Sequence, residues 1–245
     1  MKNNKIAITG SEGLIGSSIV NIFEKKNIKV IKIDKSLGLD ISQKKTIDFL
    51  NKKKPKVIIH CASHPGGLSN INPVEDVQTN CFGSINIIKW CKDFNAKLIF
   101  TSSSAVYGNQ SSRKIKENSL LKPGTIYAVN KIAIENWIKI LSKITKFPWS
   151  ILRLFSTYGA GHKPNTYQGI VNVMLTQIIR SRKIIVKGSL LRERDLIYCK
   201  DASRAIVDVL YSNKSLYKTI NIGTATRVTI NEIIKNIIEV LGYSK

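Results

Sequence analysis

The sequence of 245 residues contains few acidic side chains, few cysteines and few histidines. Its 16 Asp and Glu are set against 39 Lys and Arg, which gives a formal net charge of +23. The four cysteines have no short paired spacing, and the three histidines form no metal-ligand pattern with them. This scarcity excludes a disulfide framework and argues against a metal centre, so we expect free thiols in a reducing compartment.

Long apolar runs and a secretion signal are also lacking. No segment approaches the length that crosses a bilayer, and the polar residues Met1–Lys5 are followed by no cleavable apolar region. Lys residues are spread along most of the chain, and no basic stripe is interleaved with aromatic residues. We therefore expect a cytoplasmic protein with a solvated basic surface that binds neither membrane nor nucleic acid.

The first half of the chain alternates short β-branched runs with longer amphipathic stretches. The runs Ile6–Thr9, Ile28–Ile33, Lys56–His60 and Lys97–Thr101 are typical of strands, and the stretches between them of helices. Such alternation predicts an α/β fold of the Rossmann type, with a doubly wound parallel sheet and a ligand crevice at the carboxyl ends of its strands.

After the strand Trp149–Leu154 the pattern loosens, which predicts a small lobe over the sheet. We expect short strands at Lys183–Val186 and around Asp195–Tyr198, and a final helix Thr229–Leu241 opened by a Thr229/Glu232 capping box. The predicted division is a dinucleotide-binding domain of residues 1–158 plus 200–223, and a partial substrate-binding lobe of residues 159–199 plus 224–245.

The two longest predicted helices are Asn72–Phe94 and Thr125–Lys146. The second has apolar side chains on two faces, with Ile134 and Ile138 on one, and Trp137, Ile140 and Ile144 on another. One face is predicted to join the core, and the other to form the contact of a homodimer.

A glycine-rich loop directly follows the first strand and opens a helix. Gly10, Gly13 and Gly16 allow a tight turn and a close approach of the backbone to a pyrophosphate, with Leu14 and Ile15 at the helix start. Asp34, at the end of the second strand, is placed to accept hydrogen bonds from ribose hydroxyls and to repel a 2′-phosphate. The neighbouring Lys35 leaves room for NADP, but the pattern favours NAD.

Tyr127 and Lys131 lie four residues apart on one predicted helix, so their side chains are neighbours. We expect the ammonium to lower the pKa of the phenol toward a value suited to proton abstraction. The hydroxyls of Ser102-Ser103-Ser104, at the end of a predicted strand, are placed to bind the reacting oxygen.

With these motifs the whole chain resembles the extended short-chain dehydrogenase/reductase family, specifically its NAD-dependent nucleotide-sugar epimerases and dehydratases of the UDP-glucose 4-epimerase type. The resemblance is carried by the Thr9–Gly16 loop, Asp40-Ile41, Ile59–Ala62, Asn80, Ser103–Gly108, Tyr127/Lys131, Leu152–Phe155, Tyr158-Gly159, Arg194-Asp195 and Asn221–Gly223. It implies that Asp40 and Ile41 flank the adenine, that Cys61 and Ala62 line the cofactor, that Asn80 supports the site, and that Lys131 also holds the nicotinamide ribose.

The resemblance also separates subclasses of reaction. It places Ser103 at the catalytic Ser/Thr position, followed by Ser104 and Ala105, where 4,6-dehydratases have Asp-Glu and the epimerase-reductases have a cysteine at the second position. It therefore implies epimerisation at C4 of a nucleotide sugar through a transient 4-keto intermediate. The alternatives are a reductase or decarboxylase of the same family, or a non-catalytic NAD-binding protein.

On the substrate side, the resemblance implies that Ser103, Ser104, Ser156 and Arg194 contact the nucleotide sugar, with Arg194 on its diphosphate. Ser156 replaces the asparagine that is common in the family, and family members continue beyond Leu241-Gly242. The loop His64–Gly67 is expected to border the sugar, and His64 is expected to be exposed and without a role.

Overall fold

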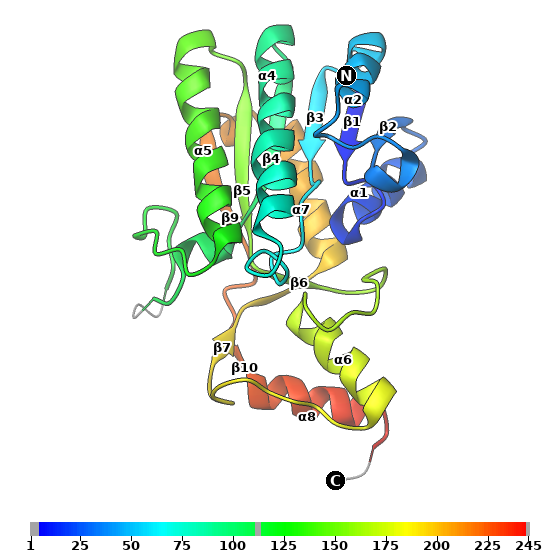
Figure 1. Ribbon diagram of the computed structural model, residues 1–245, viewed down its shortest axis with the longest axis vertical. Coiled ribbons are helices and arrows are strands. Elements are labelled where there is room, and N and C mark those ends of the chain that lie inside the picture. Colours follow the sequence, from blue (N-terminus) through cyan, green and yellow to red (C-terminus); the bar gives the residue numbers. More distant parts are fainter. Residues whose placement is uncertain (1–4, 111–113, 244–245) are drawn as a thin grey trace.

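The β-branched runs form one parallel sheet in the computed structural model, which describes residues 5–110 and 114–243 (Figure 1). The sheet has six strands in the order β2-β1-β3-β4-β5-β9. Their bounds are β1 Ile6–Thr9, β2 Val30–Ile33, β3 Val57–His60, β4 Lys97–Ser103, β5 Trp149–Leu154 and β9 Lys218–Ile222. Because β1 pairs with β2 on one side and β3 on the other, the topological switch point lies between β1 and β3. The predicted doubly wound fold is confirmed.

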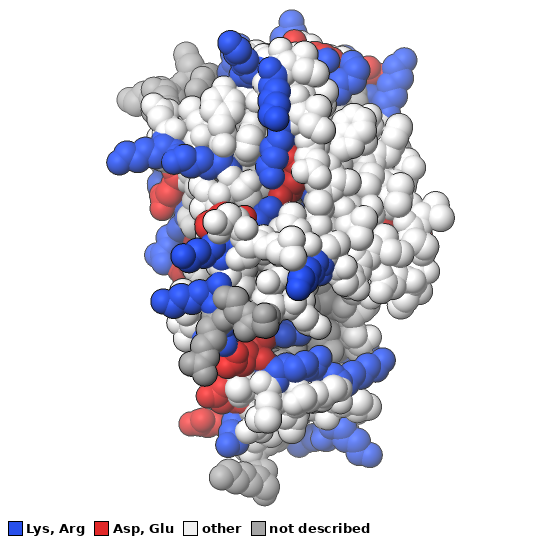
Figure 2. All heavy atoms as spheres, turned by 90° about the vertical axis from the view of Figure 1, so that its left-hand side faces the viewer, with Lys and Arg blue, Asp and Glu red and all other residues white. Residues whose placement is uncertain are grey.

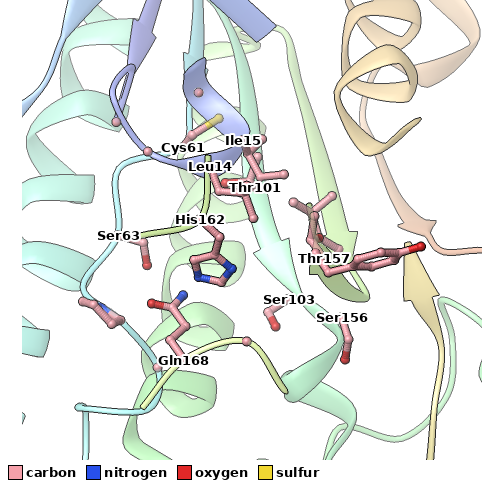
Figure 3. Close-up of a pocket in the computed structure, with 18 of the residues that line it drawn as sticks. Leu14, Ile15, Cys61, Ser63, Thr101, Ser103, Ser156, Thr157, His162 and Gln168 are labelled. Atoms are coloured by element: carbon pink, nitrogen blue, oxygen red, sulfur yellow. The ribbon is translucent and has the colours of Figure 1, made fainter. Parts of the chain in front are cut away.

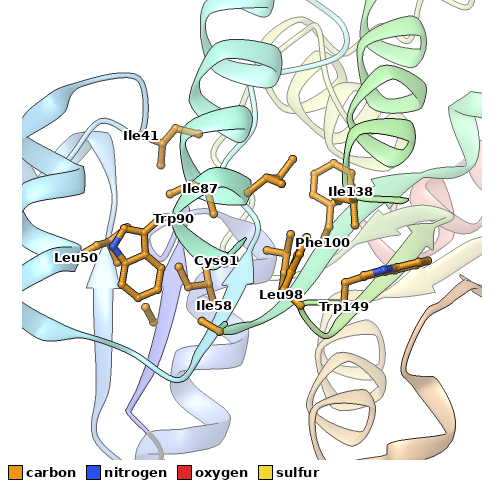
Figure 4. Close-up of a cluster of buried hydrophobic side chains, with 14 of the residues drawn as sticks. Ile41, Leu50, Ile58, Ile87, Trp90, Cys91, Leu98, Phe100, Ile138 and Trp149 are labelled. Carbon is orange, nitrogen blue, oxygen red and sulfur yellow. The ribbon is translucent and has the colours of Figure 1, made fainter. Parts of the chain in front are cut away.

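Alternating side chains divide the sheet into two apolar faces. Ala7, Ile58 and Phe100 point into one cluster, which α2 (Lys44–Lys53), α4 (Ser84–Phe94) and α5 (Ile126–Thr145) cover (Figure 4). Ile8 and Ile59 belong to the other cluster, under α1 (Leu14–Lys25) and α7 (Cys199–Tyr211). This period of two in each buried strand places helices on both faces, and thereby leaves the carboxyl ends of the strands as the open edge.

The predicted helix Asn72–Phe94 is interrupted in the structure. It consists of α3 (Pro73–Asp76), the π-helical segment η2 (Val77–Gly83) and α4. Gly83 ends the π-helical segment against the core, where a Cβ would lie 2.6 Å from Cγ1 of Ile41. The wider π turn contains Asn80, a buried side chain directed at the loop after β3. π turns of this kind occur frequently at functional sites.

The small lobe lies at the end of the sheet where the site is expected (Figure 1). It contains α6 (Ile170–Ser181), α8 (Ile230–Val240) and the strand pair β7 (Glu193–Arg194) with β10 (Val228–Thr229). The pair of β6 (Ser156–Tyr158) with β8 (Leu196–Tyr198) lies where the lobe joins the sheet, and the predicted domain division stays a prediction. The capping box of Thr229 and Glu232 is present at the start of α8. Three 3-10 turns complete the regular structure: η1 (Lys35–Leu37), η3 (Ser104–Tyr107) and η4 (Asn213–Ser215).

The predicted strand Lys183–Val186 is wrong. This segment has no sheet partner, and Ile184 and Val186 instead pack against the cluster between α6 and α8. Its β-branched residues are apolar contacts of a connecting segment, which packs on α6 and α8 instead of pairing with a strand.

The right-hand part of the face seen in Figure 2 shows few charged side chains. On the helices of this layer, α5 exposes Trp137, Ile140 and Ile144, and α4 exposes the ion pair of Lys89 with Asp93. Val74 of α3 and Phe82 of η2 are also exposed. The core face of α5 is also as predicted, since Ile134 and Ile138 are fully buried. The homodimer itself stays a prediction.

Across the described ranges, no helix combines the length and apolarity needed to cross a bilayer. The four cysteines are free thiols. No group of three His, Cys, Asp or Glu that could hold a metal ion occurs among the residues that the structure describes.

Candidate functional site

A cavity of about 870 Å³ lies between the open edge of the sheet and the small lobe (Figure 3). The sheet side contributes the glycine loop, the residues after β3 and the end of β4, and α5 contributes Tyr127 and Lys131. The lobe side contributes Ser156, Arg194 and the loop 159–169. Of the predicted site residues, those that line the cavity are Gly10, Gly13, Leu14, Ile15, Gly16, Asp34, Cys61, Ser103, Tyr127, Lys131, Ser156 and Arg194.

The glycine loop has the geometry of a phosphate cradle. Gly10 has a φ of +67°, and a Cβ there would lie 2.7 Å from the backbone nitrogen of Ala62. A Cβ on Gly16 would lie 2.0 Å from the carbonyl oxygen of Gly10. Gly13 precedes α1 without a side-chain cap, so the first amides of the helix remain available to an anion. The backbone therefore fits a dinucleotide pyrophosphate.

Asp34 joins the end of β2 to this cradle. Its Oδ2 accepts a hydrogen bond from the backbone N–H of Glu12 at 3.1 Å, and its Oδ1 accepts two from Ser36 at 2.9 Å. Lys35 lies on the other side, with its Nζ 3.9 Å from Oδ2 of Asp40. The Asp34 carboxylate is thus fixed beside the cradle, and the Lys35 ammonium is attracted to the Asp40 carboxylate. That Asp34 binds the ribose stays a prediction.

Five predicted residues do not line the cavity: Asp40, Ile41, Ala62, Asn80 and Ser104. Ile41 belongs to the core cluster, and the backbone N–H of Ala62 donates to Oγ1 of Thr9 at 3.2 Å. The adenine-flanking role of Asp40 and Ile41 stays a prediction.

Asn80 acts on the site through the loop after β3. Its Oδ1 accepts hydrogen bonds from the Ser63 hydroxyl at 2.8 Å and from the His64 N–H at 2.9 Å. The expectation that His64 is exposed is wrong, since its side chain is buried with Nδ1 3.9 Å from the Glu75 carboxylate. Pro65 and Gly66 line the cavity, as expected of a loop that borders the sugar.

The predicted catalytic residues are brought together. Thr125 caps α5 by accepting a hydrogen bond from the N–H of Ala128 at 3.2 Å, which places Tyr127 in the first turn. One turn later, Nζ of Lys131 lies 5.4 Å from the centroid of the Tyr127 ring and donates to the carbonyl of Thr101 at 3.1 Å. Ser103 ends β4 beside the phenol.

The pKa of Tyr127 is shifted in the direction opposite to the one expected. Burial raises it, and the hydroxyls of Ser63 and Ser103 offset only part of this effect. Lys131 has its own pKa lowered to about 8, mainly by burial. The expectation failed because desolvation of the phenol dominates its pKa, and the nearby Asp76 carboxylate raises that pKa further.

Two buried hydrogen-bond networks lie next to Ser103, Tyr127 and Lys131 and fix the elements that contain them. His60 bridges Oγ1 of Thr9 at 2.6 Å and Oγ of Ser84 at 3.0 Å, and burial, with a smaller effect of Lys131, lowers its pKa to about 3. This neutral imidazole ties β1, β3 and α4 together.

The second network is an ion pair between α5 and β5. Nε and Nη2 of Arg153 donate to the Glu135 carboxylate at 2.9 and 2.7 Å, and both side chains are at most 3% exposed. Ser102 donates to the same carboxylate at 2.6 Å. The strand end that contains Ser103 is therefore fixed to the helix that contains Tyr127.

Four further residues that line the cavity were not predicted from the sequence (Figure 3). They are Ser63, Thr157, His162 and Gln168. Ser63 follows directly after Cys61 and Ala62, which was a usable signal. His162 and Gln168 lie in a loop without periodicity, so no local pattern distinguishes them.

The comparisons with known proteins agree with this geometry. The family model described as "NAD dependent epimerase/dehydratase family" matches residues 6–223. A Methanocaldococcus jannaschii protein named "Putative UDP-glucose 4-epimerase" is 28% identical over 97% of this chain and 83% of its own length. GDP-L-fucose synthase of Sinorhizobium fredii is 26% identical over 99% of this chain and 82% of its own length.

A solved structure is similar at the level of the whole fold. UDP-glucuronic acid 4-epimerase from Bacillus cereus, in complex with UDP-glucuronic acid and NAD, has a TM-score of 0.87 and 26% identity, covering 98% of this chain and 84% of that one. The glycine cradle and the Tyr127/Lys131 pair are the features that a dinucleotide-dependent sugar enzyme requires. The chain therefore belongs to the NAD-dependent epimerase/dehydratase family, whose members are enzymes of nucleotide-sugar chemistry.

Proposed function

We propose that this protein is a nucleotide-sugar 4-epimerase that uses NAD. The observation that supports this most directly is the meeting of Ser103, Tyr127 and Lys131 at one wall of a cavity that the glycine cradle also lines. NAD, when bound in the cradle, supplies a reversible hydride acceptor. The protein's own residues supply the proton transfer, the orientation of the sugar and the exclusion of water.

Tyr127 is the proposed base and acid at the C4 oxygen of the sugar. As the phenolate it takes the hydroxyl proton, and as the phenol it returns a proton to the 4-keto sugar after the sugar has turned its other face. Ser103 shares the hydrogen bond to the same oxygen. The Lys131 ammonium, held by the Thr101 carbonyl, favours the phenolate by its charge.

The residues after Ser103 favour epimerisation over elimination of water. Ser104 and Ala105 begin η3, and the N–H of Ala105 donates to Oγ of Ser103 at 3.2 Å. Neither side chain can serve as the carboxylic acid or carboxylate base that removal of a hydroxyl group needs. Arg194, half-buried on the lobe side of the cavity, is the proposed partner of the substrate diphosphate.

The test is turnover with nucleotide sugars. We expect purified protein with added NAD to convert UDP-glucose, UDP-N-acetylglucosamine or UDP-glucuronic acid to its C4 epimer, measured by NMR, without net formation of NADH. Net consumption of added NADH identifies a reductase instead, and release of carbon dioxide identifies a decarboxylase. Folded protein that retains NAD and converts none of these sugars, nor a GDP- or dTDP-hexose, contradicts the proposal.

A further inference from the structure

The loop between β6 and α6, residues 159–169, places a histidine inside the cavity. We call this loop the strap. His162 lines the cavity together with Gln168, and in the close-up its ring lies between the labelled Ser63 and Ser103 (Figure 3). The ring packs against the backbone of Gly169, where a Cβ would lie 2.4 Å from Cε1 of His162. Gly169 also has a φ of +74°, which favours glycine.

The strap is held to the sheet side by backbone contact. A Cβ on Gly67 would lie 1.5 Å from the carbonyl oxygen of Tyr167. The neighbouring Gly66 packs on the Tyr127 ring, with a Cβ position 3.1 Å from Cγ of that ring. The loop that touches the proposed catalytic tyrosine therefore also fixes the strap that contains His162.

The polar atoms of His162 are not used within the protein. Its Nδ1 is buried and has no hydrogen-bond partner among the described residues, and no other hydrogen bond of the ring is seen there. Burial lowers the pKa of the ring, which is therefore neutral near pH 7. Since an unpaired buried N–H costs more than an unpaired lone pair, the favoured tautomer has its proton on Nε2. The ring thus offers a neutral N–H donor to the cavity.

We propose that His162 is a specificity-determining residue, whose Nε2–H donates a hydrogen bond to an oxygen of the hexose bound beside Tyr127. The inference rests on the proposed function, because it takes the occupant of this part of the cavity to be the sugar of a nucleotide sugar. The strap contacts Gly67, so the position of this neutral donor is defined. It can therefore distinguish hexoses by where their hydroxyl groups lie, and it does not attract anions by charge.

The test compares UDP-glucose with UDP, which lacks the hexose. We expect His162→Phe to lower the affinity of the NAD-supplemented protein for UDP-glucose about tenfold to a hundredfold by calorimetry, and to leave the affinity for UDP unchanged. His162→Gln, which keeps an N–H donor at similar reach, restores part of the loss. Thr166→Ala, on the exposed side of the strap and outside the cavity lining, is the matched control and binds as the wild type does.

A second variant reaches the same histidine from the other side of the cavity. Gly67→Ala displaces the strap, so it is expected to weaken UDP-glucose binding as His162→Phe does, while the protein still binds NAD. Equal binding of UDP-glucose by wild type and His162→Phe overturns the inference and leaves the proposed function standing. Wild-type protein that binds none of the nucleotide sugars named in the test of the proposed function overturns both.

Discussion

At the scale of the residue, Tyr127 is the side chain whose removal separates chemistry from binding. We expect Tyr127→Phe to lower the rate of epimerisation by about 10²- to 10⁴-fold, because phenylalanine cannot take or return the proton of the C4 oxygen. NAD retention, measured by fluorescence, should not change, since the cradle lies on α1 and β1. A Tyr127→Phe protein with near wild-type turnover contradicts the assignment, and loss of NAD in this variant indicates a structural role.

His60 should make stability depend on pH. Its pKa is about 3 in the folded protein against an ordinary value of 6.5, so the unfolded chain binds the additional proton between these limits. Stability from this group is therefore present above pH 6.5 and is lost as the pH falls, by about 2 kcal/mol between pH 7 and pH 5. Urea unfolding of wild type and of His60→Asn, which does not titrate, measures the difference. Parallel stability curves contradict it.

Motifs with fixed local spacing were predictable from the sequence at this scale. The glycines, Asp34, Ser103, Tyr127 and Lys131 line one cavity as expected. The direction of the Tyr127 pKa shift was not predictable, because it depends on how much solvent the folded site excludes. His162 was not predictable either, since its place depends on Gly67, which is distant in sequence and touches the strap only in the folded chain.

At the scale of elements, the Glu135–Arg153 pair joins α5 to the sheet. Arg153→Met removes the bidentate partner of the buried carboxylate and leaves it with Ser102 and the half-exposed Lys139, 3.7 Å away, so we expect a loss of about 3–5 kcal/mol in unfolding free energy. The control is Arg204→Met, which breaks an exposed pair with Asp201 and should cost less than about 1 kcal/mol. Replacing Glu135 and Arg153 together by Leu and Met should recover much of the loss. A small effect of Arg153→Met alone would show that the pair is not needed.

Element types followed from apolar periodicity, whereas their irregularities did not. The period of two in Ile6–Ile8 and Val57–Ile59 correctly gave strands buried on both faces. The π turn around Asn80 differs from an α-helix only in its backbone hydrogen bonding, which the pattern of apolar side chains does not reveal. Lys183–Val186 has the composition of a strand, but pairing requires a neighbouring strand edge that only the tertiary arrangement can provide.

At the scale of the whole molecule, the exposed apolar face of α5, which contains Trp137, Ile140 and Ile144, predicts self-association. A monomer rarely leaves an apolar helix face of this kind in water. We expect the wild type to sediment as a dimer at micromolar concentration, and Ile140→Glu, at a site 59% exposed, to sediment as a monomer. Ile185→Glu, at a site 71% exposed on the small lobe, is the control and should remain dimeric. A monomeric mass for the wild type rules the dimer out.

The small lobe has a core of its own, separate from the two clusters on the sheet, with Met174, Ile178, Ile230, Ile233 and Ile237 as its buried members. Because so few side chains are buried there, the free energy of locally opening α6 and α8 is modest. Their amide protons should therefore exchange with deuterium sooner than those of β3 and β4. A nucleotide sugar that contacts both the lobe and the sheet side of the cavity couples the local opening of α6 and α8 to the stability of the sheet. Added ligand should therefore slow exchange throughout α6 and α8, including positions remote from any bound atom.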